Sequence, residues 1–310
     1  MGERDGVAAA GVVSGDDRLP VLVVGATGKT GRAVVAALLA REVPARAAVR
    51  AGRENAAPEG STAVAVDLVS GRGLAAALDG VGAVYHLAPN MHPDEVRIAE
   101  QVAGAASAAG VGRLVLHSVL HPHDERMPHH VRKALAEEVL RSALGGRLTV
   151  LRPAAYHQNL VGQARAGVLR VPYSLDAPFT NVDLDDVAQV AADALAGAHP
   201  GGTLELAGPE VLTTRQLAEQ AAAALGRPVH GTRMPLDEWL AGPGAALTAQ
   251  ARHDLAAMFA AYDESGLVGD PQVLPALLGH PATTWRTRVA RTASPQAPTG
   301  RAVPGRDVPR

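Results

Sequence analysis

The sequence of 310 residues predicts an α/β fold in which a doubly wound parallel sheet is followed by a small C-terminal α+β cap. Two observations predict the sheet: Val-rich apolar segments lack helical spacing, and amphipathic segments of helical length separate them. A third predicts the cap, because this alternation breaks down beyond Pro153. We expect a sheet domain at 18–155, a smaller substrate-binding region at 156–290 that is partly interleaved with it, and flexible tails at 1–17 and 291–310.

The first predicted strand, residues 19–24, leads into a glycine-rich turn and then into an apolar helix at 33–40. The turn has the spacing GxxGxxG, and the order strand, turn, helix is the front half of a dinucleotide-binding βαβ unit. Gly25 permits the tight turn, Gly28 leaves room for a pyrophosphate, and Gly31 lets the helix approach the strand. The N-terminus of the helix offers free N–H groups to the phosphates. The alternative is a tight turn in some other α/β protein.

The rest of the sheet domain continues the alternation of strands and helices. Further strands are predicted at 45–50, 61–68, 81–89, 113–119 and 147–153. Helices are predicted at 73–78, at 93–109 with Pro93 in the first turn, and at 129–144, and a polar loop is predicted at 52–60.

The cap region is predicted to be mainly helical. Helices are expected at 156–167, 183–196, 252–266 and 271–278, a strand at 203–206 and an irregular loop at 168–180. A further helix begins at Thr213, where Gln216 completes a capping box, and it ends at Gly226 before a proline. We expect the cap to cover the carboxyl edge of the sheet, where α/β proteins bind ligands.

Composition excludes several classes of protein. The chain has no cysteine, which excludes disulfides, thiolate metal sites and a cysteine nucleophile. The formal net charge is −2 without a basic block, so nucleic-acid binding lacks its electrostatic basis. No apolar run reaches the roughly 20 residues of a membrane span, and the N-terminus does not have the composition of a signal peptide. We therefore expect a cytoplasmic protein that binds neither nucleic acid nor membrane.

The end of the second strand indicates which dinucleotide binds. A carboxylate there binds the ribose of NAD, whereas an arginine accommodates the 2′-phosphate of NADP. Arg50 ends this strand and Arg53 follows it, so the sequence favours NADP over NAD; the alternative is a pair of solvated loop arginines. Lys29 is expected to add positive charge near the pyrophosphate. Asp67 ends the third strand, where it either reaches the adenine edge or caps a turn.

Several motifs follow one another in register along the chain. They read VVGATGKTGRAVV, YHLAPNM, GVGRLVLHSVLHP, HHVRKALAEEVL, LTVLRPAAYHQNL and, in the cap, VDLDDVA and LAGPEVLTTRQLAEQAAAALGRPV. From about Leu19 to about Arg288 this ordered set resembles the NmrA-like branch of the atypical short-chain dehydrogenase/reductases. The resemblance implies a Rossmann fold, a site for NADP or NAD and a small C-terminal substrate domain. The cofactor-binding positions that it implies are Gly25, Thr27, Gly28, Lys29, Thr30, Gly31, Arg50, Arg53, Asp67, Leu68, Ala88, Pro89 and Lys133.

The wider superfamily uses a Ser, a Tyr and a Lys for catalysis, with the Lys four residues after the Tyr on one helical face. By resemblance, Ser118 matches the Ser, and Lys133 matches the Lys that holds the nicotinamide ribose. The position of the Tyr is His129, a departure from the pattern of ordinary ketone reductases. His129 is a candidate proton donor, since the pKa of histidine lies nearer neutrality than that of a phenol, or else a surface histidine. The alternative for Lys133 is a solvated lysine paired with Glu137.

Residues beyond the fourth and sixth strands are expected to meet the substrate. The resemblance places Asn90, Tyr156 and Asn159 in the substrate pocket, with Tyr156 as a second candidate for the proton donor. The alternative is that Tyr156 packs the joint between the two domains.

Five histidines lie between His117 and His130, which raises the question of a metal site. His121 and His123 have chelating spacing, but a proline stiffens the pair and no zinc-binding motif is present, so we expect no metal. A GxSxG motif is also absent, so hydrolase chemistry has no support.

The leading hypothesis is an NADP(H)-dependent oxidoreductase of the NmrA-like type that acts on a small uncharged carbonyl, quinone or enone compound. Two alternatives stay open. One is a redox sensor that binds NADP without turnover and reports to a partner protein, which the missing Tyr favours. The other is a redox-neutral biosynthetic enzyme, such as a cyclase or isomerase, on the same fold. A small-molecule substrate is the expected partner, and a homodimer stays open.

Overall fold

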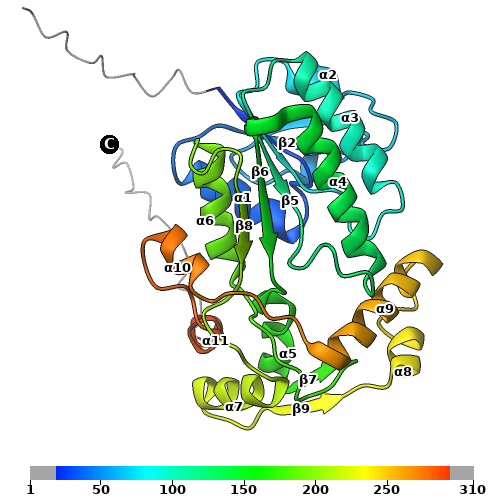
Figure 1. Ribbon diagram of the computed structural model, residues 1–310. Coiled ribbons are helices and arrows are strands. Elements are labelled where there is room, and N and C mark those ends of the chain that lie inside the picture. Colours follow the sequence, from blue (N-terminus) through cyan, green and yellow to red (C-terminus); the bar gives the residue numbers. More distant parts are fainter. Residues whose placement is uncertain (1–18, 294–310) are drawn as a thin grey trace, which may run out of the picture.

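The computed structural model describes residues 19–293, and it contains a sheet of seven parallel strands with helices on both faces (Figure 1). The strands are β1 (Val21–Val23), β2 (Ala45–Val49), β3 (Thr62–Ala65), β4 (Ala83–His86), β5 (Arg113–His117), β6 (Leu148–Pro153) and β8 (Thr203–Leu206). Their order in the sheet is β3-β2-β1-β4-β5-β6-β8, so the direction of winding reverses between β1 and β4. The predicted doubly wound parallel sheet is confirmed, and this reversal is where such folds bind ligands.

Burial on both faces explains why these short apolar segments form strands. Every residue of β1 and of β4 is buried, including the polar residues Tyr85 and His86. β3 is an edge strand, and its terminal residues Thr62 and Ala65 are exposed.

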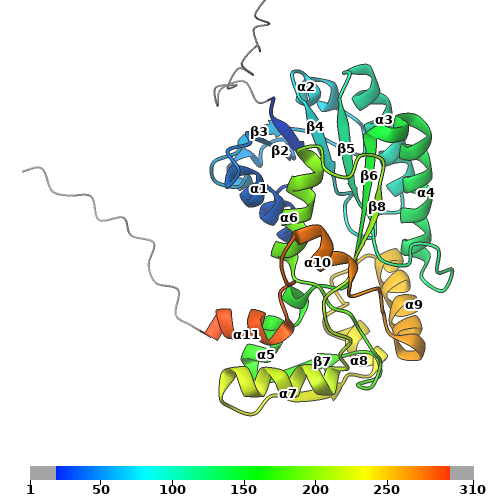
Figure 2. The same ribbon diagram turned by 60° about the vertical axis from the view of Figure 1, so that its left-hand side comes forward.

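Two layers of helices cover the sheet (Figure 2). The helices of one layer are α1 (Lys29–Leu39), α6 (Leu184–Leu195) and α10 (Val273–Leu278), and those of the other are α2 (Leu74–Leu78), α3 (Glu95–Ala108) and α4 (Pro128–Leu144). Val34 and Val187 pack in the core of the first layer, and Ile98 and Leu140 in that of the second. Each fully buried side chain of this kind contributes about 1.5–3 kcal/mol, so the two cores hold the carboxyl edge of the sheet in place.

The glycine turn between β1 and α1 has the geometry that its sequence predicts. Gly25 has a φ of +79°, which other residues rarely adopt. A Cβ atom on Gly31 would lie 2.2 Å from the carbonyl oxygen of Gly25, so a larger residue would push α1 away from the turn.

The cap lies beyond the carboxyl edge of the main sheet (Figure 1). Its strands β7 (Val168–Val171) and β9 (His230–Arg233) pair in parallel, and its helices are α5 (Val161–Ala166), α7 (Thr214–Leu225), α8 (Leu236–Ala241), α9 (Ala249–Ser265) and α11 (Trp285–Ala293). Trp285 is fully buried in the cap core and donates from its ring N–H to the carbonyl of Leu217 at 2.8 Å. Helix α9 also contacts α4, which joins the cap to the sheet domain. Three short 3-10 turns are η1 (Glu54–Ala56), η2 (Gly145–Arg147) and η3 (His157–Asn159).

Several elements of the cap differ from prediction. The expected loop at 168–180 contains β7, and the hydrophobic pattern does not predict β9, α8 or α11. β9 reads His-Gly-Thr-Arg and is mostly exposed, so it has no apolar periodicity to detect. The expected helix at 156–167 begins only after Tyr156, which is extended, and it is divided into η3 and α5. Pro93 precedes α3 instead of occupying its first turn.

Part of the region 156–290, which we expected to be partly interleaved with the sheet domain, lies with the large sheet. Both β8 and α6 belong to the large sheet and its helical layer, although their residues fall in the predicted cap region. Residues 291–293 form the last turn of α11, so the prediction of a tail is wrong for them. The predicted tail at 1–17 and the remainder of the other, 294–310, lie outside the described residues.

The predicted start of α7 is confirmed. Thr213 accepts a hydrogen bond from the backbone N–H of Gln216, and the Gln216 side chain accepts one from the N–H of Thr213. Between residues 19 and 293, no helix combines the length and apolarity that would let it cross a membrane.

Candidate active site

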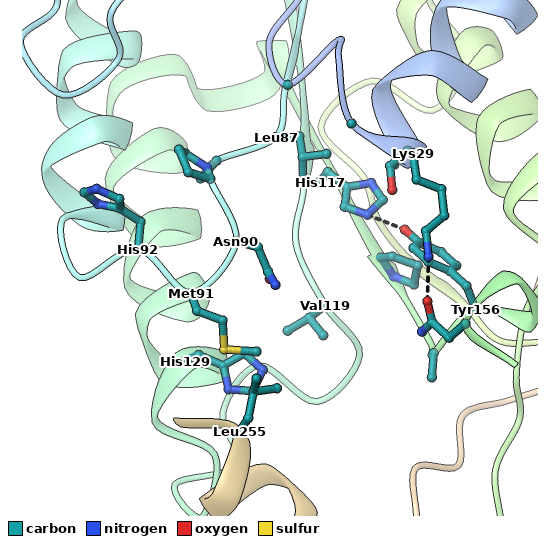
Figure 3. Close-up of a pocket in the computed structure, with 18 of the residues that line it drawn as sticks. Lys29, Leu87, Asn90, Met91, His92, His117, Val119, His129, Tyr156 and Leu255 are labelled. Atoms are coloured by element: carbon teal, nitrogen blue, oxygen red, sulfur yellow. Dashed lines mark hydrogen bonds between the residues drawn. The ribbon is translucent and has the colours of Figure 1, made fainter. Parts of the chain in front are cut away.

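A cavity of about 1040 Å³ lies between the carboxyl edge of the main sheet and the cap (Figure 3). Its wall extends from the glycine turn, along the ends of β2 to β6, to α9. The predicted site residues in this wall are Gly25, Thr27, Gly28, Lys29, Thr30, Arg50, Arg53, Asp67, Leu68, Ala88, Pro89, Asn90, Ser118, His129, Lys133, Tyr156 and Asn159. Gly31 is outside the wall, where it packs α1 against Gly25.

The glycine-turn end of the cavity has features that attract phosphate. No side chain caps the N-terminus of α1, so the first N–H groups and the helix dipole are available to an anion. The Arg32 side chain donates to the carbonyl of Thr27 at 3.1 Å and to that of Ala56 at 2.8 Å. Arg32 thus fastens the glycine turn to the loop after β2. The motif does not reveal this role, which depends on a contact to a distant loop.

Arg50 and Arg53 lie exposed in the wall beside the glycine turn. Within residues 19–293 neither guanidinium group pairs with a carboxylate, and the nearby Glu54 carboxylate accepts from the backbone N–H of Gly52 at 3.0 Å. Two free guanidinium groups beside an uncapped helix N-terminus suit the phosphates of NADP(H). The residues of this end therefore fit the predicted cofactor.

Asp67 caps a turn, which is one of the two roles that the sequence left open. Its carboxylate accepts from the hydroxyl of Ser70 at 2.7 Å and from the N–H of Val69 at 3.0 Å. These hydrogen bonds, that of Ser70 first, hold the pKa of Asp67 below its ordinary value. Asp67 also borders the cavity.

Lys133 and Ser118 both face acidic residues. The ammonium group of Lys133 donates to the carboxylate of Glu95 at 2.7 Å. The predicted alternative of a solvated pair with Glu137 is wrong, because Glu137 is buried and forms an ion pair with Arg152 at 2.6 Å. The Ser118 hydroxyl donates to Glu137 at 2.5 Å. Its proton is therefore directed at a buried carboxylate and away from any substrate carbonyl.

His129 is buried in the cavity wall, on the same side as Met91 and Leu255 (Figure 3). Its ring is T-shaped to that of His130, with centroids 4.4 Å apart. Burial, and then the neighbouring His130 and Lys133, lower the pKa of His129 to about 3. This lowered pKa does not support the near-neutral value on which the expectation of a proton donor rested, and burial contradicts the alternative of a surface histidine. At neutral pH His129 is an uncharged imidazole.

Three polar side chains from neighbouring strand ends form one hydrogen-bonded chain. The hydroxyl of Tyr85 lies 2.5 Å from Nδ1 of His117. The hydroxyl of Tyr156 lies 2.6 Å from Nε2 of the same ring, as Figure 3 shows. Burial lowers the pKa of His117 to about 3 and raises the pKa of Tyr156. Tyr85 and His117 were absent from the predicted site. The sequence does contain a feature that could have predicted them: each of two neighbouring buried strands has a polar residue near its end. Such strand ends meet at one edge of the sheet.

The Lys29 side chain extends from the start of α1 to the segment after β6. Its ammonium group donates to the Asn159 side-chain oxygen at 2.6 Å and lies 5.5 Å from the centroid of the Tyr156 ring (Figure 3). Three predicted residues from α1 and from the segment after β6 therefore meet on one side of the cavity.

The cap contributes an aromatic wall that the sequence did not predict. The ring of Phe259 lies 4.9 Å from that of Trp239 and 6.2 Å from that of Tyr173, between centroids. Tyr262 lines the same wall, together with Leu255, Met258 and Leu267. Asp67, at the opposite end, is the only acidic residue among the described residues that line the cavity. The cap end therefore suits a flat, uncharged ligand.

The histidines of the 117–130 segment diverge in the structure. His121 donates from Nε2 to the carbonyl of Val268 at 2.8 Å, and His123 lies 3.5 Å from the guanidinium group of Arg152. Across residues 19–293, no group of three His, Cys, Asp or Glu side chains is arranged to hold a metal ion.

Comparison with known proteins identifies the family. A sequence model of the NmrA-like family matches residues 18–284. The chain belongs to the NmrA-like family. An NAD(P)H azoreductase of Xenophilus azovorans is 29% identical over 274 residues, which are 86% of this chain and 95% of that protein. Quinone oxidoreductase 2 of Escherichia coli (strain K12) is 30% identical over 284 residues, 87% of this chain and 97% of that protein.

A solved structure is also similar to this chain. The crystal structure of an NADPH-dependent quinone oxidoreductase from Escherichia coli, complexed with NADPH, has a TM-score of 0.75 and 26% sequence identity. The match covers 88% of this chain and 100% of that chain. The resemblance drawn from the motifs, and the Rossmann fold that it implied, are confirmed.

Proposed function

We propose that this NmrA-like protein is an NADP(H)-dependent oxidoreductase that passes a hydride to a small, uncharged acceptor of the quinone type. One observation carries the proposal: in a single cavity, an uncapped helix N-terminus at the glycine turn lies at one end, and aromatic side chains of the cap without acidic residues line the other. The azoreductase and the quinone oxidoreductase among its relatives support oxidoreductase chemistry. The NADPH in the similar crystal structure supports the cofactor.

The residues at the glycine-turn end would bind the cofactor in two places. The N–H groups at the start of α1 would hold the pyrophosphate, and Arg50 and Arg53 would hold the 2′-phosphate. Lys133 would reach the nicotinamide ribose while Glu95 fixes its ammonium group. When bound there, NADPH supplies a hydride.

The states of His129 and Ser118 fit a quinone acceptor better than a simple ketone. Hydride transfer to a ketone makes a strongly basic alkoxide, so ketone reductases place a proton donor beside the carbonyl. Hydride transfer to a quinone makes a less basic, phenolate-type anion, which hydrogen bonds and a nearby positive charge can stabilise. Here the imidazole of His129 is neutral, and the Ser118 hydroxyl donates to Glu137. His129 and Ser118 therefore do not supply a ketone reductase's proton, which leaves Tyr156 as the candidate donor among the predicted catalytic residues.

NADPH oxidation tests the proposed activity. The protein would be incubated with NADPH and a panel of quinones, enones and simple ketones while the absorbance of the reduced nicotinamide is followed. We expect oxidation that depends on the quinone, that is faster with NADPH than with NADH, and that is slow with simple ketones. A simple ketone that reacts faster than every quinone would contradict the assigned acceptor.

One observation favours a redox sensor as the second candidate, because His129 occupies the position of the superfamily tyrosine. A sensor would bind NADPH tightly, and no acceptor in the panel would oxidise it. A product that forms without net change in NADPH would instead indicate a redox-neutral enzyme.

A further inference from the structure

The tyrosine and lysine that meet in this cavity come from different elements than those of the superfamily pattern. In that pattern one helix carries both residues, but here Lys133 of α4 is paired with Glu95, and the residue four positions earlier is His129. Here the tyrosine that has a lysine beside it is Tyr156, after β6, and the ammonium group beside its ring belongs to Lys29, at the start of α1 (Figure 3).

The hydrogen-bonded chain behind Tyr156 sets the direction of its hydroxyl proton. His117 is neutral, so its ring has one N–H and one lone pair. Tyr85 is fully buried, and His117 is the only hydrogen-bond partner of its hydroxyl among the described residues. A proton on Nδ1 would leave the Tyr85 hydroxyl proton buried without an acceptor, which is unfavourable. Tyr85 therefore donates to Nδ1 of His117, and Nε2–H donates to the oxygen of Tyr156.

The hydroxyl proton of Tyr156 is then available to a ligand. The Tyr156 oxygen already accepts from His117 at 2.6 Å, so its own proton needs another acceptor. Burial raises the pKa of Tyr156, and a hydrogen bond from the Thr30 side chain opposes this only in part. Tyr156 therefore keeps its proton and acts as a hydrogen-bond donor. The side chains of Asn90 and Val119 lie across the cavity from it (Figure 3).

Lys29 adds a positive charge at the same place. Its ammonium group donates to Asn159 at 2.6 Å and lies 5.5 Å from the centroid of the Tyr156 ring. Over the described part of the chain no carboxylate pairs with Lys29, in contrast to Lys133, whose charge Glu95 neutralises. A hydroxyl donor and an uncompensated cation on the same side of the cavity stabilise an oxygen atom that gains negative charge between them.

We propose that Tyr156 and Lys29 bind the acceptor oxygen that becomes negatively charged during reduction, an inference that rests on the proposed function. Tyr85 and His117 are positioning residues that aim the Tyr156 hydroxyl at this oxygen. The quinone takes up a hydride, which is two electrons and one proton, while NADPH is oxidised to NADP⁺. The resulting hydroquinone monoanion accepts the Tyr156 hydrogen bond beside Lys29, and a second proton from solvent completes the hydroquinone.

Binding of 4-nitrophenol tests the oxygen site without turnover. The phenolate form carries a charged oxygen on a flat ring, and its absorbance differs from that of the neutral phenol. With the protein saturated with NADP⁺, we expect the pKa of the bound probe to lie below its value in solution.

Tyr156→Phe and Lys29→Met should each weaken phenolate binding about tenfold or more. Lys29→Arg, which keeps the charge, should retain most of the affinity for phenolate. Equal affinity for both forms of the probe, or variants that bind phenolate as tightly as the wild type, would overturn the proposal.

Kinetic measurements show whether Tyr85 acts through the Tyr156 hydroxyl or only supports the fold. Tyr156→Phe should lower kcat with a quinone by about 100-fold, with the affinity for NADPH unchanged. Tyr85→Phe should lower kcat less, and the Tyr85→Phe/Tyr156→Phe double variant should lose no more than Tyr156→Phe alone, because Tyr85 acts through Tyr156. Across a series of quinones, the factor by which Tyr156→Phe lowers kcat should also grow with the basicity of the hydroquinone anion. Additive losses, or the same loss for every quinone, would contradict this assignment.

The two proposals fail in different ways. Quinone-dependent NADPH oxidation with variants that behave like the wild type would overturn the oxygen site and leave the proposed function standing. A wild-type protein that prefers nitrophenolate but never oxidises NADPH would support the oxygen site and contradict the proposed function. Thermal unfolding of each variant shows whether its fold is intact.

Discussion

The ammonium group of Lys133 lies 2.7 Å from the carboxylate of Glu95, and the two side chains are only 11% and 3% exposed. Glu95 begins α3 and Lys133 belongs to α4, so this ion pair joins two neighbouring helices at the wall of the cavity. A buried ion pair adds little to stability as a whole, but the loss of one partner leaves an uncompensated buried charge. The contribution of Lys133 to stability can therefore be separated from its expected role in cofactor binding, by removing Lys133 alone or together with Glu95.

Lys133→Met should lower the free energy of unfolding by about 3–5 kcal/mol, because the Glu95 carboxylate stays buried without its partner. The double variant Lys133→Met/Glu95→Leu should recover most of that loss, and chemical denaturation measures both changes. If Lys133 holds the nicotinamide ribose, both variants should bind NADPH weakly. Wild-type affinity in the double variant would show that Lys133 has a structural role only.

Gly31→Ala should destabilise the glycine turn. The new Cβ atom would lie 2.2 Å from the carbonyl oxygen of Gly25, a contact that only a shift of α1 can relieve. We expect a loss of about 1–3 kcal/mol in the free energy of unfolding and weaker NADPH binding, because the N-terminus of α1 moves with the helix. Gly104 of α3 is the matched control, since a Cβ there meets no atom within 4 Å. Gly104→Ala should be neutral or stabilising by up to about 1 kcal/mol, and equal effects of the two substitutions on NADPH affinity would contradict the assigned role of Gly31.

The sequence predicted those features that depend on local pattern. The buried strands β1 and β4 follow from apolar runs, and the approach of α1 to its turn follows from Gly25 and Gly31. Arg50 and Arg53 lie on the cofactor side of the cavity because they follow β2, whose position the strand order fixes. Such features need no knowledge of distant contacts.

The remaining features depend on contacts between distant segments. The Lys29 side chain reaches Asn159, which follows it by 130 residues, and the glycine motif alone does not predict this contact. His129 loses its near-neutral pKa through burial, which no local pattern records. The partner of Lys133 is Glu95 of another helix, whereas helical spacing suggested Glu137. β9 has no apolar alternation and exists only because β7 offers it a pairing edge.

Asp183 should make the stability of the protein depend on acid pH. Asp183 is the N-cap of α6, its side chain is fully buried, and Arg288 of α11 pairs with it. Burial alone would raise the pKa of Asp183, but its charged and hydrogen-bonding surroundings, Arg288 among them, hold that pKa well below the ordinary value. A depressed pKa in the folded state means that the stabilisation is complete above the unfolded-state pKa of about 3.9 and is lost as the pH falls below it.

Asp183→Asn should therefore lower the free energy of unfolding at pH 7 by about 3–5 kcal/mol, and the difference from the wild type should shrink below about pH 4. Urea denaturation across this range measures it. Asp185 also pairs with Arg288 but is 64% exposed, so Asp185→Asn is the matched control and should cost far less. A difference that stays constant down to the acid limit would contradict the linkage.

Arg50→Ala should reduce the preference for NADPH over NADH. Arg50 lies exposed in the cavity wall, and no carboxylate among residues 19–293 competes for its guanidinium group, so the 2′-phosphate is its expected partner. The loss of a charged hydrogen bond should raise the Kd of NADPH about 10- to 100-fold and leave that of NADH nearly unchanged. Fluorescence titration of the reduced nicotinamide measures both Kd values.

Arg286, exposed on α11 and outside the cavity wall, is the control, and Arg286→Ala should change neither affinity. Because this contact is exposed, added salt should reduce the NADPH preference of the wild type but hardly that of Arg50→Ala. An equal loss of affinity for NADPH and NADH in Arg50→Ala would show that this arginine does not bind the 2′-phosphate.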